Sequence, residues 1–177
     1  KAEACFDFDP SQEFQLLVAR LLNESGERTQ AFQCDEPILF EMVCQMHTRI
    51  PGLYGYLTIN KSDGTLVWES DSYDVLPNSL DELSVGRYRI HIQIPTRTLA
   101  PGDYTVYVNF ASFSGLEDFN VCSPGTILSF RLDDYHSRRG NRRRGYFGTL
   151  LSWNVAEVTG VQAHMRDHVH SNMGVKE

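Results

Sequence analysis

The sequence has no hydrophobic run close to the roughly 18 residues that a membrane-spanning helix requires. It also does not open with the succession of charged, apolar and small residues that marks a secretory signal. We therefore expect neither a membrane span nor a secretory signal in these residues. The first residue is Lys1 rather than methionine, which indicates a fragment or a processed product.

The motifs of common catalytic sites are missing as well. There is no G-x-x-x-x-G-K-[ST] phosphate loop, no H-E-x-x-H zinc motif and no G-x-S-x-G nucleophile turn. The adjacent carboxylates of Asp133 and Asp134 fall at the end of an expected strand, where solvated acids are common, so they make a poor glycosidase pair. We accordingly expect no enzymatic activity, no cofactor and no metal.

Three histidines near the C-terminus, His164, His168 and His170, form an H-x-x-x-H-x-H cluster. On a helix the first two would share a face and could hold a metal ion. A solvated polar tail is the simpler interpretation, and it is the one that we adopt.

Cysteine content and charge narrow the class of protein further. The four cysteines lie far apart and include no C-x-x-C pair, which favours reduced thiols in a cytoplasmic protein over a disulfide framework. The net charge of −7 argues against nucleic acid as a partner. A chain of 177 residues with 41% hydrophobic content is long enough for one domain with a buried core.

What the sequence does contain is a period-two alternation of apolar and polar residues, the pattern of β-strands with one buried face. The alternation places Tyr104, Val106, Val108 and Phe110 on the core face of one strand. The segments expected to form strands are 14–22, 36–47, 53–60, 66–70, 86–94, 99–113, 126–133 and 146–155.

Two details of this assignment depend on local sequence. In the first segment the alternation predicts that Phe14, Leu16 and Val18 share the buried face, and residues 114–123 are expected to form a loop.

No helical pattern of about 10–15 residues separates the strands, which excludes parallel β-α-β units.

We therefore predict an all-β fold, namely a two-sheet antiparallel β-sandwich of immunoglobulin-like or jelly-roll type with about eight strands. The expected organisation is a lead-in at 1–11, the sandwich at 12–156 and a polar tail at 157–177.

The outward faces of the expected strands carry the best binding signal. If the strands follow immunoglobulin order, one sheet presents aromatic rings beside an amide and a guanidinium, a mixture that suits saccharide. The candidate carbohydrate-binding residues are Tyr54, Tyr56, Trp68, Tyr107, Asn109 and Arg131, with Arg89, His91 and Gln93 on the other sheet as a second candidate. Ordinary cross-strand aromatic pairing and a subunit interface are the alternatives.

An arginine-rich segment follows the expected strand 126–133. It holds Arg138, Arg139, Arg142, Arg143 and Arg144 within seven residues. A solvated loop is the simplest interpretation. Contact with an anionic surface, contact with an acidic partner, and a hinge that lets the last strand reach a neighbouring subunit are the alternatives.

Several motifs, taken in order, resemble one known family. They are V-A-R-L-L-N-E-S-G-E from Val18, F-Q-C-D-E-P-I-L-F-E-M from Phe32, N-K-S-D-G-T-L-V from Asn60, L-A-P-G-D-Y-T-V-Y-V from Leu99 and G-x-L-L-S-W from Gly148. The family is the C-terminal domain of the ATP-binding, Wzt-type subunit of bacterial O-antigen ABC exporters. The glycine that opens the first motif in the family is absent here.

This resemblance implies a cytoplasmic β-sandwich, at the inner face of the bacterial inner membrane, that recognises the non-reducing end of a lipid-linked polysaccharide and couples recognition to export. It implies homodimers that exchange a C-terminal strand, here 146–155. ATP hydrolysis would belong to a separate N-terminal nucleotide-binding domain that works with a transmembrane permease. The resemblance supplies no ligand motif, so the candidate residues rest on the face analysis. A dimerisation or docking module remains the alternative function.

Overall fold

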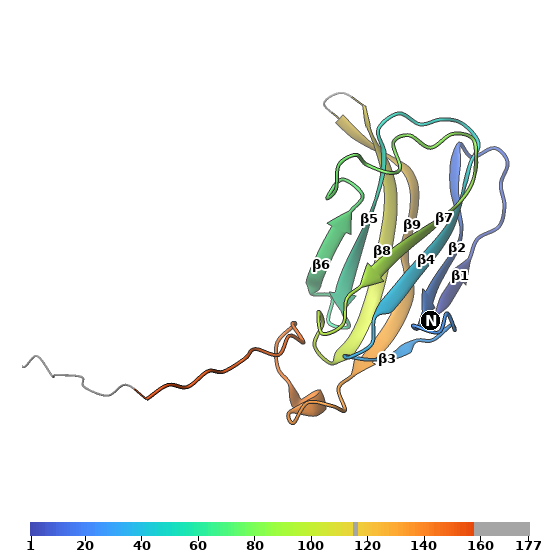
Figure 1. Ribbon diagram of the computed structural model, residues 1–177. Helices are drawn as coiled ribbons and strands as arrows, with labels where there is room; N and C mark the ends of the chain where they lie inside the picture. The colour runs from blue at the N-terminus through green and yellow to red at the C-terminus, as the bar shows by residue number, and fades with distance from the viewer. Residues whose placement is uncertain (115–116, 158–177) are drawn as a thin grey trace, which may run out of the picture.

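A computed structural model describes residues 1–114 and 117–157, which form two β-sheets packed face to face (Figure 1). In chain order the elements are β1 (Glu3–Cys5), β2 (Phe14–Leu22), β3 (Ala31–Gln33), β4 (Ile38–Met46), β5 (Leu53–Lys61), β6 (Leu66–Asp71), β7 (Gly86–Ile94), β8 (Gly102–Ser114), β9 (Glu117–Asp133) and the 3₁₀ turn η1 (Gly140–Arg142).

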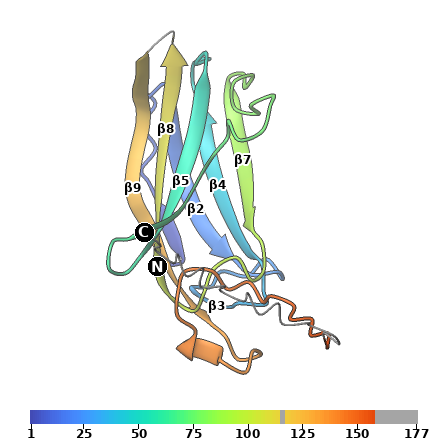
Figure 2. The same ribbon diagram turned by 90° about the vertical axis from the view of Figure 1, so that its left-hand side faces the viewer.

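One sheet has the strand order β1-β2-β4-β7 and the other has the order β3-β9-β8-β5-β6. Every pair of neighbouring strands is antiparallel except β3 and β9, which are parallel at one edge of the larger sheet. Figure 2 shows the two sheets side by side, with β8 and β9 at one side and β7 at the other. The predicted all-β sandwich is confirmed.

The core lies between the sheets and follows the alternation of the sequence. On β8, the side chains of Tyr104, Val106, Val108 and Phe110 are each no more than 2% exposed. The Phe110 ring lies 4.7 Å from the ring of Phe14 on the opposite sheet, measured between centroids. The strand pattern therefore predicted correctly which residues of β8 hold the two sheets together.

The buried face of β2 differs from the prediction at one residue. Phe14 and Leu16 are buried as expected, but Val18 is only half-buried, and Ala19 and Leu21 take the next core positions. The pairing of β2 with β4 shifts register between Leu16 and Val18, which marks a β-bulge. A bulge inserts one residue and reverses the faces that follow it, so the simple period of two was wrong beyond Leu16.

The loop predicted for 114–123 is also wrong, because β9 already begins at Glu117 and runs 17 residues to Asp133. The β8–β9 hairpin tolerates Pro124 and Gly125 within the strand through register shifts between Val106 and Phe110 of its partner. Bulged positions do not require the ladder hydrogen bond that proline cannot donate.

The last predicted strand, 146–155, does not form a strand within this chain. A single bridge joins Phe147 to Leu99, and the Thr149 hydroxyl donates to the Arg97 carbonyl at 3.2 Å. Residues 150–157 then run away from the sandwich with no strand pairing (Figure 1). At Gly148 a Cβ atom would lie 2.2 Å from the carbonyl oxygen of Leu99, so the close approach there requires glycine. Alternation alone does not make a strand, because the segment must also lie along a sheet edge and pair with it.

The remaining parts of the chain bear on the other expectations. The expected lead-in, 1–11, contains β1, which pairs with β2. Most of the expected polar tail, with its three histidines, lies outside the described residues.

All four cysteines have free thiols, as expected from their spacing. In the part of the chain that the structure describes, there is no helix long and apolar enough to cross a membrane.

Candidate functional site

Four tyrosines gather on the outer surface of the larger sheet, and we call this surface the tyrosine face. Tyr54 and Tyr56 come from β5, Tyr107 from β8 and Tyr73 from the connection after β6. The ring centroids of Tyr54 and Tyr73 are 4.9 Å apart, those of Tyr56 and Tyr107 are 6.1 Å apart, and those of Tyr54 and Tyr56 are 6.4 Å apart. These rings form a continuous aromatic surface across two strands and a loop.

Asn109 lies at the base of this surface, directly opposite Tyr56 in the β5–β8 pairing, and is 2% exposed. Its Nδ2 donates to the Tyr56 hydroxyl at 3.2 Å and to Oδ1 of Asn120 at 2.8 Å. Its Oδ1 is buried and accepts no hydrogen bond from the described residues. A buried acceptor without a donor costs stability. The Asn109 side chain is therefore only partly satisfied by its neighbours.

The surroundings of the face raise the pKa of two of its tyrosines, Tyr54 and Tyr107. Burial raises the pKa of Tyr54, and the neighbouring carboxylate of Asp118 raises it further. Burial also raises the pKa of Tyr107, with a contribution from Tyr56. The hydroxyl groups of Tyr54 and Tyr107 can therefore both donate and accept, and the carboxylate of Asp118 lies beside Tyr54.

The structure does not bring all of the predicted residues to this surface. Arg131 is on the same face but opposite Asp103, about 13 Å along β8 from Tyr107, and its Nε lies 3.2 Å from the Asp133 carboxylate. Trp68 pairs with the inward-facing Ile59. Its side chain therefore lies on the inner side of the sheet, opposite to the tyrosines, and packs against the core. Trp68 is therefore not part of the tyrosine face.

The second candidate, Arg89 with His91, lies on the outer face of the other sheet and is committed to an ion-pair network. His91 Nε2 is 2.9 Å and Arg89 Nε is 3.4 Å from Oε2 of Glu41, and Arg20 Nη1 is 3.1 Å from Oε1 of that residue. The hydrogen bond from His91 is the main cause that lowers the pKa of Glu41, although burial opposes it. The ion pairs and hydrogen bonds of these side chains are therefore formed with one another, across β2, β4 and β7.

Three residues of the tyrosine face were missed in the sequence: Tyr73, Asp118 and Asn120. Tyr73 is on an irregular connection, so no periodicity could place it. Asp118 and Asn120 lie in the segment expected to be a loop. Strict alternation back from the core-facing Leu128 would have placed both on the core side instead. The register shifts of the β8–β9 pairing bring them to the outer face, and no sequence pattern announces those shifts.

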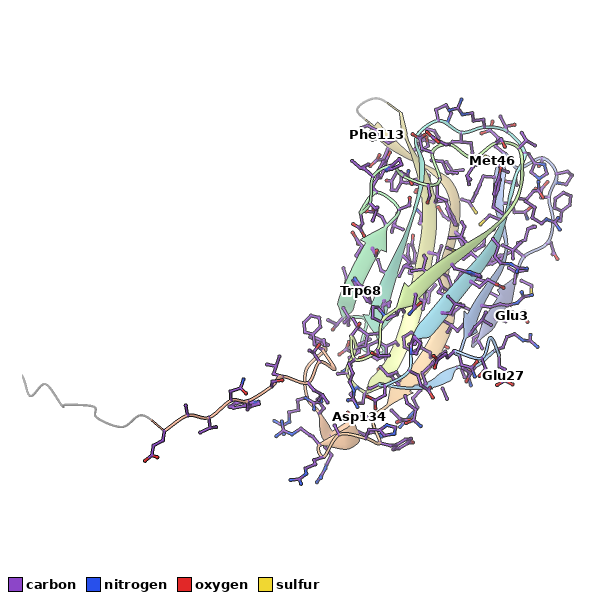
Figure 3. All side chains as sticks on the ribbon, in the orientation of Figure 1. Glu3, Glu27, Met46, Trp68, Phe113 and Asp134 are labelled. Carbon is purple, nitrogen blue, oxygen red and sulfur yellow. The ribbon has the colours of Figure 1, made fainter. Side chains whose placement is uncertain are left out.

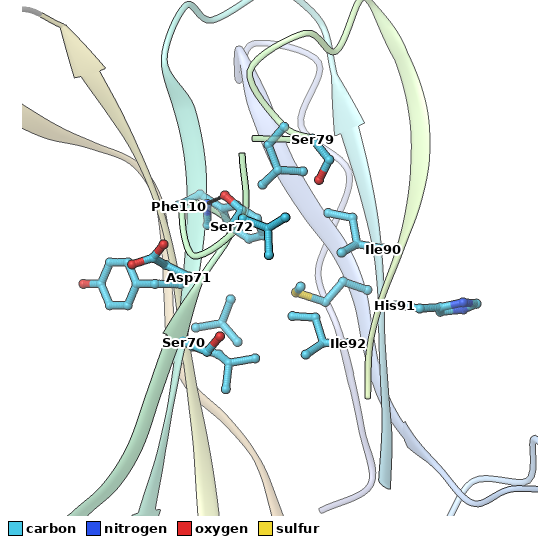
Figure 4. A pocket seen from close by; sticks show the side chains of 15 residues that line it. Ser70, Asp71, Ser72, Ser79, Ile90, His91, Ile92 and Phe110 are labelled. Atoms are coloured by element: carbon cyan, nitrogen blue, oxygen red, sulfur yellow. Dashed lines mark hydrogen bonds between the residues drawn. The ribbon is translucent and has the colours of Figure 1, made fainter. Parts of the chain in front are cut away.

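A separate hollow of about 270 Å³ lies between the two sheets where β6 and β7 leave the sandwich edge open. Figure 4 shows Ile90, Ile92 and Phe110 pointing into it, whereas His91 points away. Its lining is mostly apolar, with serine hydroxyls of β6 and the following connection at the rim. This hollow can accept an apolar group but presents few polar atoms for specific recognition.

The two adjacent aspartates have a structural role. Asp134 is 2% exposed and receives hydrogen bonds from Arg97 at 2.7 Å and from the Ser137 hydroxyl at 2.6 Å.

Within residues 1–114 and 117–157 no cluster of three or more histidine, cysteine, aspartate or glutamate side chains could hold a metal ion. The histidine cluster of the tail lies beyond these residues.

Comparisons with known proteins agree with the fold. A family model described as the Wzt C-terminal domain matches residues 11–142. The crystal structure of the C-terminal domain of Wzt matches with a TM-score of 0.65 and 10% sequence identity, covering 82% of this chain and 86% of that one. A β-glucosidase from Listeria innocua in complex with gluconolactone matches with a TM-score of 0.42 and 10% identity over 69% of this chain and 16% of that one, too weakly to carry an argument. No curated protein matches significantly.

Proposed function

The chain belongs to the family of Wzt C-terminal domains, and from this premise we propose that it recognises the non-reducing terminus of a lipid-linked O-antigen polysaccharide. Family membership supports the coarser role, a part in an O-antigen ABC transporter. In the proposed function the domain binds glycan without catalysis and couples completion of the polysaccharide to its export. The nucleotide-binding domain and the permease are the proposed partners, at the cytoplasmic face of the inner membrane.

The observation that carries the proposal is the tyrosine face with Asn109 at its base. Aromatic rings stack on the C–H faces of sugar rings, and neighbouring amide and hydroxyl groups bond sugar hydroxyls. Asn109 Nδ2 holds the Tyr56 hydroxyl in place through a hydrogen bond, and the raised pKa of Tyr107 keeps a hydroxyl available that can donate and accept. Asp118 beside Tyr54 disfavours a negatively charged sugar here. A neutral hydroxylated terminus is the ligand that suits this surface.

Replacing Tyr107 or Asn109 with alanine is expected to weaken glycan binding at least about tenfold, which corresponds to about 1.4 kcal/mol. Tyr107→Ala removes a stacking ring, and Asn109→Ala also frees the Tyr56 hydroxyl from its partner. Isothermal titration of the 177-residue chain with delipidated O-polysaccharide of the producing strain measures the change.

Tyr135→Ala is the matched control, because this tyrosine is 68% exposed and lies outside the tyrosine face. It should bind as the unaltered chain does. Trimming the non-reducing end of the polysaccharide with an exoglycosidase should abolish binding. Unchanged affinity of both face variants, with thermal unfolding showing that they are folded, would contradict the proposed site.

An assembly module is a second candidate function, because the C-terminal segment exposes apolar side chains. Leu151, Trp153 and Val155 are 76%, 90% and 95% exposed. A row of exposed apolar residues on an extended segment is suited to pairing with a strand edge of another copy. The proposal is a homodimer in which segment 146–155 is exchanged.

Light scattering is expected to give a dimer for the intact chain and a monomer after deletion from Gly145 onward. Leu151→Asp/Trp153→Asp should have the same effect, since it keeps the contacts of Phe147 and Gly148 with the sandwich. An intact chain that is monomeric at high concentration would rule out strand exchange.

A further inference from the structure

Four arginine side chains surround one open hollow after the end of β9. Arg138, Arg139, Arg142 and Arg144 line a space of about 720 Å³ around η1. Figure 3 shows side chains with nitrogen ends gathered around this segment, beyond the labelled Asp134. We call this space the arginine hollow. Arg143, the fifth arginine of the segment, is half-buried and does not line it.

The backbone that carries these arginines is held by a set of hydrogen bonds. Asp134 Oδ1 accepts from the backbone N–H of Ser137 at 2.9 Å, and Asn141 Oδ1 accepts from the backbone N–H of Asp134 at 2.7 Å. Asn141 Nδ2 also donates to Asp133 at 2.9 Å, and the Gly140 N–H donates to the Ser137 carbonyl at 3.0 Å. The backbone of the loop is therefore held in one conformation, so that binding has to order the arginine side chains but not the backbone that carries them.

The charge of the hollow has no counterpart nearby. Among the described residues, none of the four guanidinium groups has a carboxylate within 4.0 Å. By contrast, Arg97 and Arg20 of the sandwich each pair with two acids. The chain has 23 acidic residues and a net charge of −7, so unpaired cations at one place are not a consequence of its composition. Like charges held close together repel and favour an anion between them.

We propose that the arginine hollow is a binding site for phosphate groups, carried either by a soluble phosphate compound or by phospholipid headgroups. A guanidinium donates two parallel N–H groups to two oxygens of one phosphate, which lysine cannot do. Four such groups around one space supply enough donors and charge for a diphosphate or for two adjacent headgroups. A single carboxylate would leave most of these donors unpaired.

This site is distinct from the tyrosine face. Figure 3 labels Phe113, near the Asp118 end of that face, and Asp134, at the start of the arginine loop, at opposite ends of the sandwich. Among the residues that the structure describes, the tyrosine face carries a carboxylate and no unpaired arginine, whereas those lining the hollow are all arginines. The phosphate-site proposal therefore does not depend on glycan recognition and can fail or succeed separately.

Titration with inorganic pyrophosphate tests one source of phosphate, and flotation with phosphatidylcholine vesicles that contain phosphatidylglycerol tests the other. Arg138→Gln/Arg142→Gln should weaken whichever binding is found at least about tenfold, because two of the four forks are removed. Arg49→Gln/Arg87→Gln is the charge-matched control, since both arginines are exposed and distant from the hollow. Two controls take their net negative charge from carboxylates instead of phosphate: citrate in solution, and phosphatidylcholine vesicles in which oleate replaces phosphatidylglycerol.

Binding of pyrophosphate that the hollow variant loses and the control keeps supports a soluble phosphate ligand. Binding only to phosphatidylglycerol vesicles, with the same dependence on variants, supports headgroups. Three results would overturn the proposal. They are no binding to either probe, an equal loss of binding in the hollow variant and in the control variant, or binding to citrate or to the oleate-containing vesicles that equals binding to the phosphate probes. An acidic protein partner would give the last of these patterns.

Discussion

Replacing Arg97 with alanine is expected to lower the free energy of unfolding by about 3–5 kcal/mol, the usual cost of leaving a buried charge without its partner. The guanidinium bonds Asp35 at 2.5 and 2.6 Å and Asp134 at 2.7 Å. The Asp134 side chain is completely buried. Arg97 thereby joins the β7–β8 connection to the end of β9, where the arginine loop begins.

The loss should depend on pH. Burial alone would raise the pKa of Asp134, but the hydrogen bonds from Arg97 and Ser137 outweigh it and hold this pKa well below its ordinary value near 3.9. A depressed folded-state pKa stabilises the fold above the unfolded pKa, and the stabilisation is lost as the pH falls below it. The difference between the unaltered chain and Arg97→Ala should therefore shrink below about pH 4.

Urea unfolding followed by circular dichroism at pH 7 and at pH 3 measures both effects. Arg28→Ala is the control, because the Arg28 side chain is 60% exposed in its pair with Glu3, and exposed pairs contribute only about 0–1 kcal/mol. A cost for Arg97→Ala no larger than that of Arg28→Ala would contradict the structural role assigned to this arginine.

Replacing Phe110 with alanine should be comparably severe, at about 3–5 kcal/mol. The Phe110 side chain is 1% exposed, packs on Phe14 of the opposite sheet and covers Gly55, where a Cβ atom would lie 2.8 Å from its ring. It also lines the hollow between the sheets. Truncation would enlarge that hollow in a place where rigid strands cannot collapse to fill it.

Phe113→Ala on the same strand is the matched control, because this side chain is 48% exposed. We expect it to cost less than about 1 kcal/mol, since little apolar surface is buried there. Urea unfolding of both variants compares the two positions. Equal costs would contradict the assignment of Phe110 to the contact between the sheets.

The tyrosine face was predictable in part, for a physical reason. The side chains of a strand alternate, so the sequence placed Tyr107 and Asn109 on one side of β8 and Tyr54 and Tyr56 on one side of β5. That these two strands are neighbours, with Tyr56 opposite Asn109, follows from strand pairing between residues 53 apart. Trp68 was misassigned because it pairs with Ile59, whose side chain faces the core, so the Trp68 ring lies on the inner side of the sheet.

By itself, the sequence determined that this protein is a β-sandwich and which side of most strands faces the core, because alternation over several residues is a local property of the chain. The tertiary structure alone decided the bulge in β2, the length of β9 and the unpaired state of segment 150–157, since each depends on whether a partner edge is available. It alone also gave Asp134 its burial and its partner Arg97. Residues distant in sequence meet only when the whole fold is complete, and the candidate sites depend on such meetings.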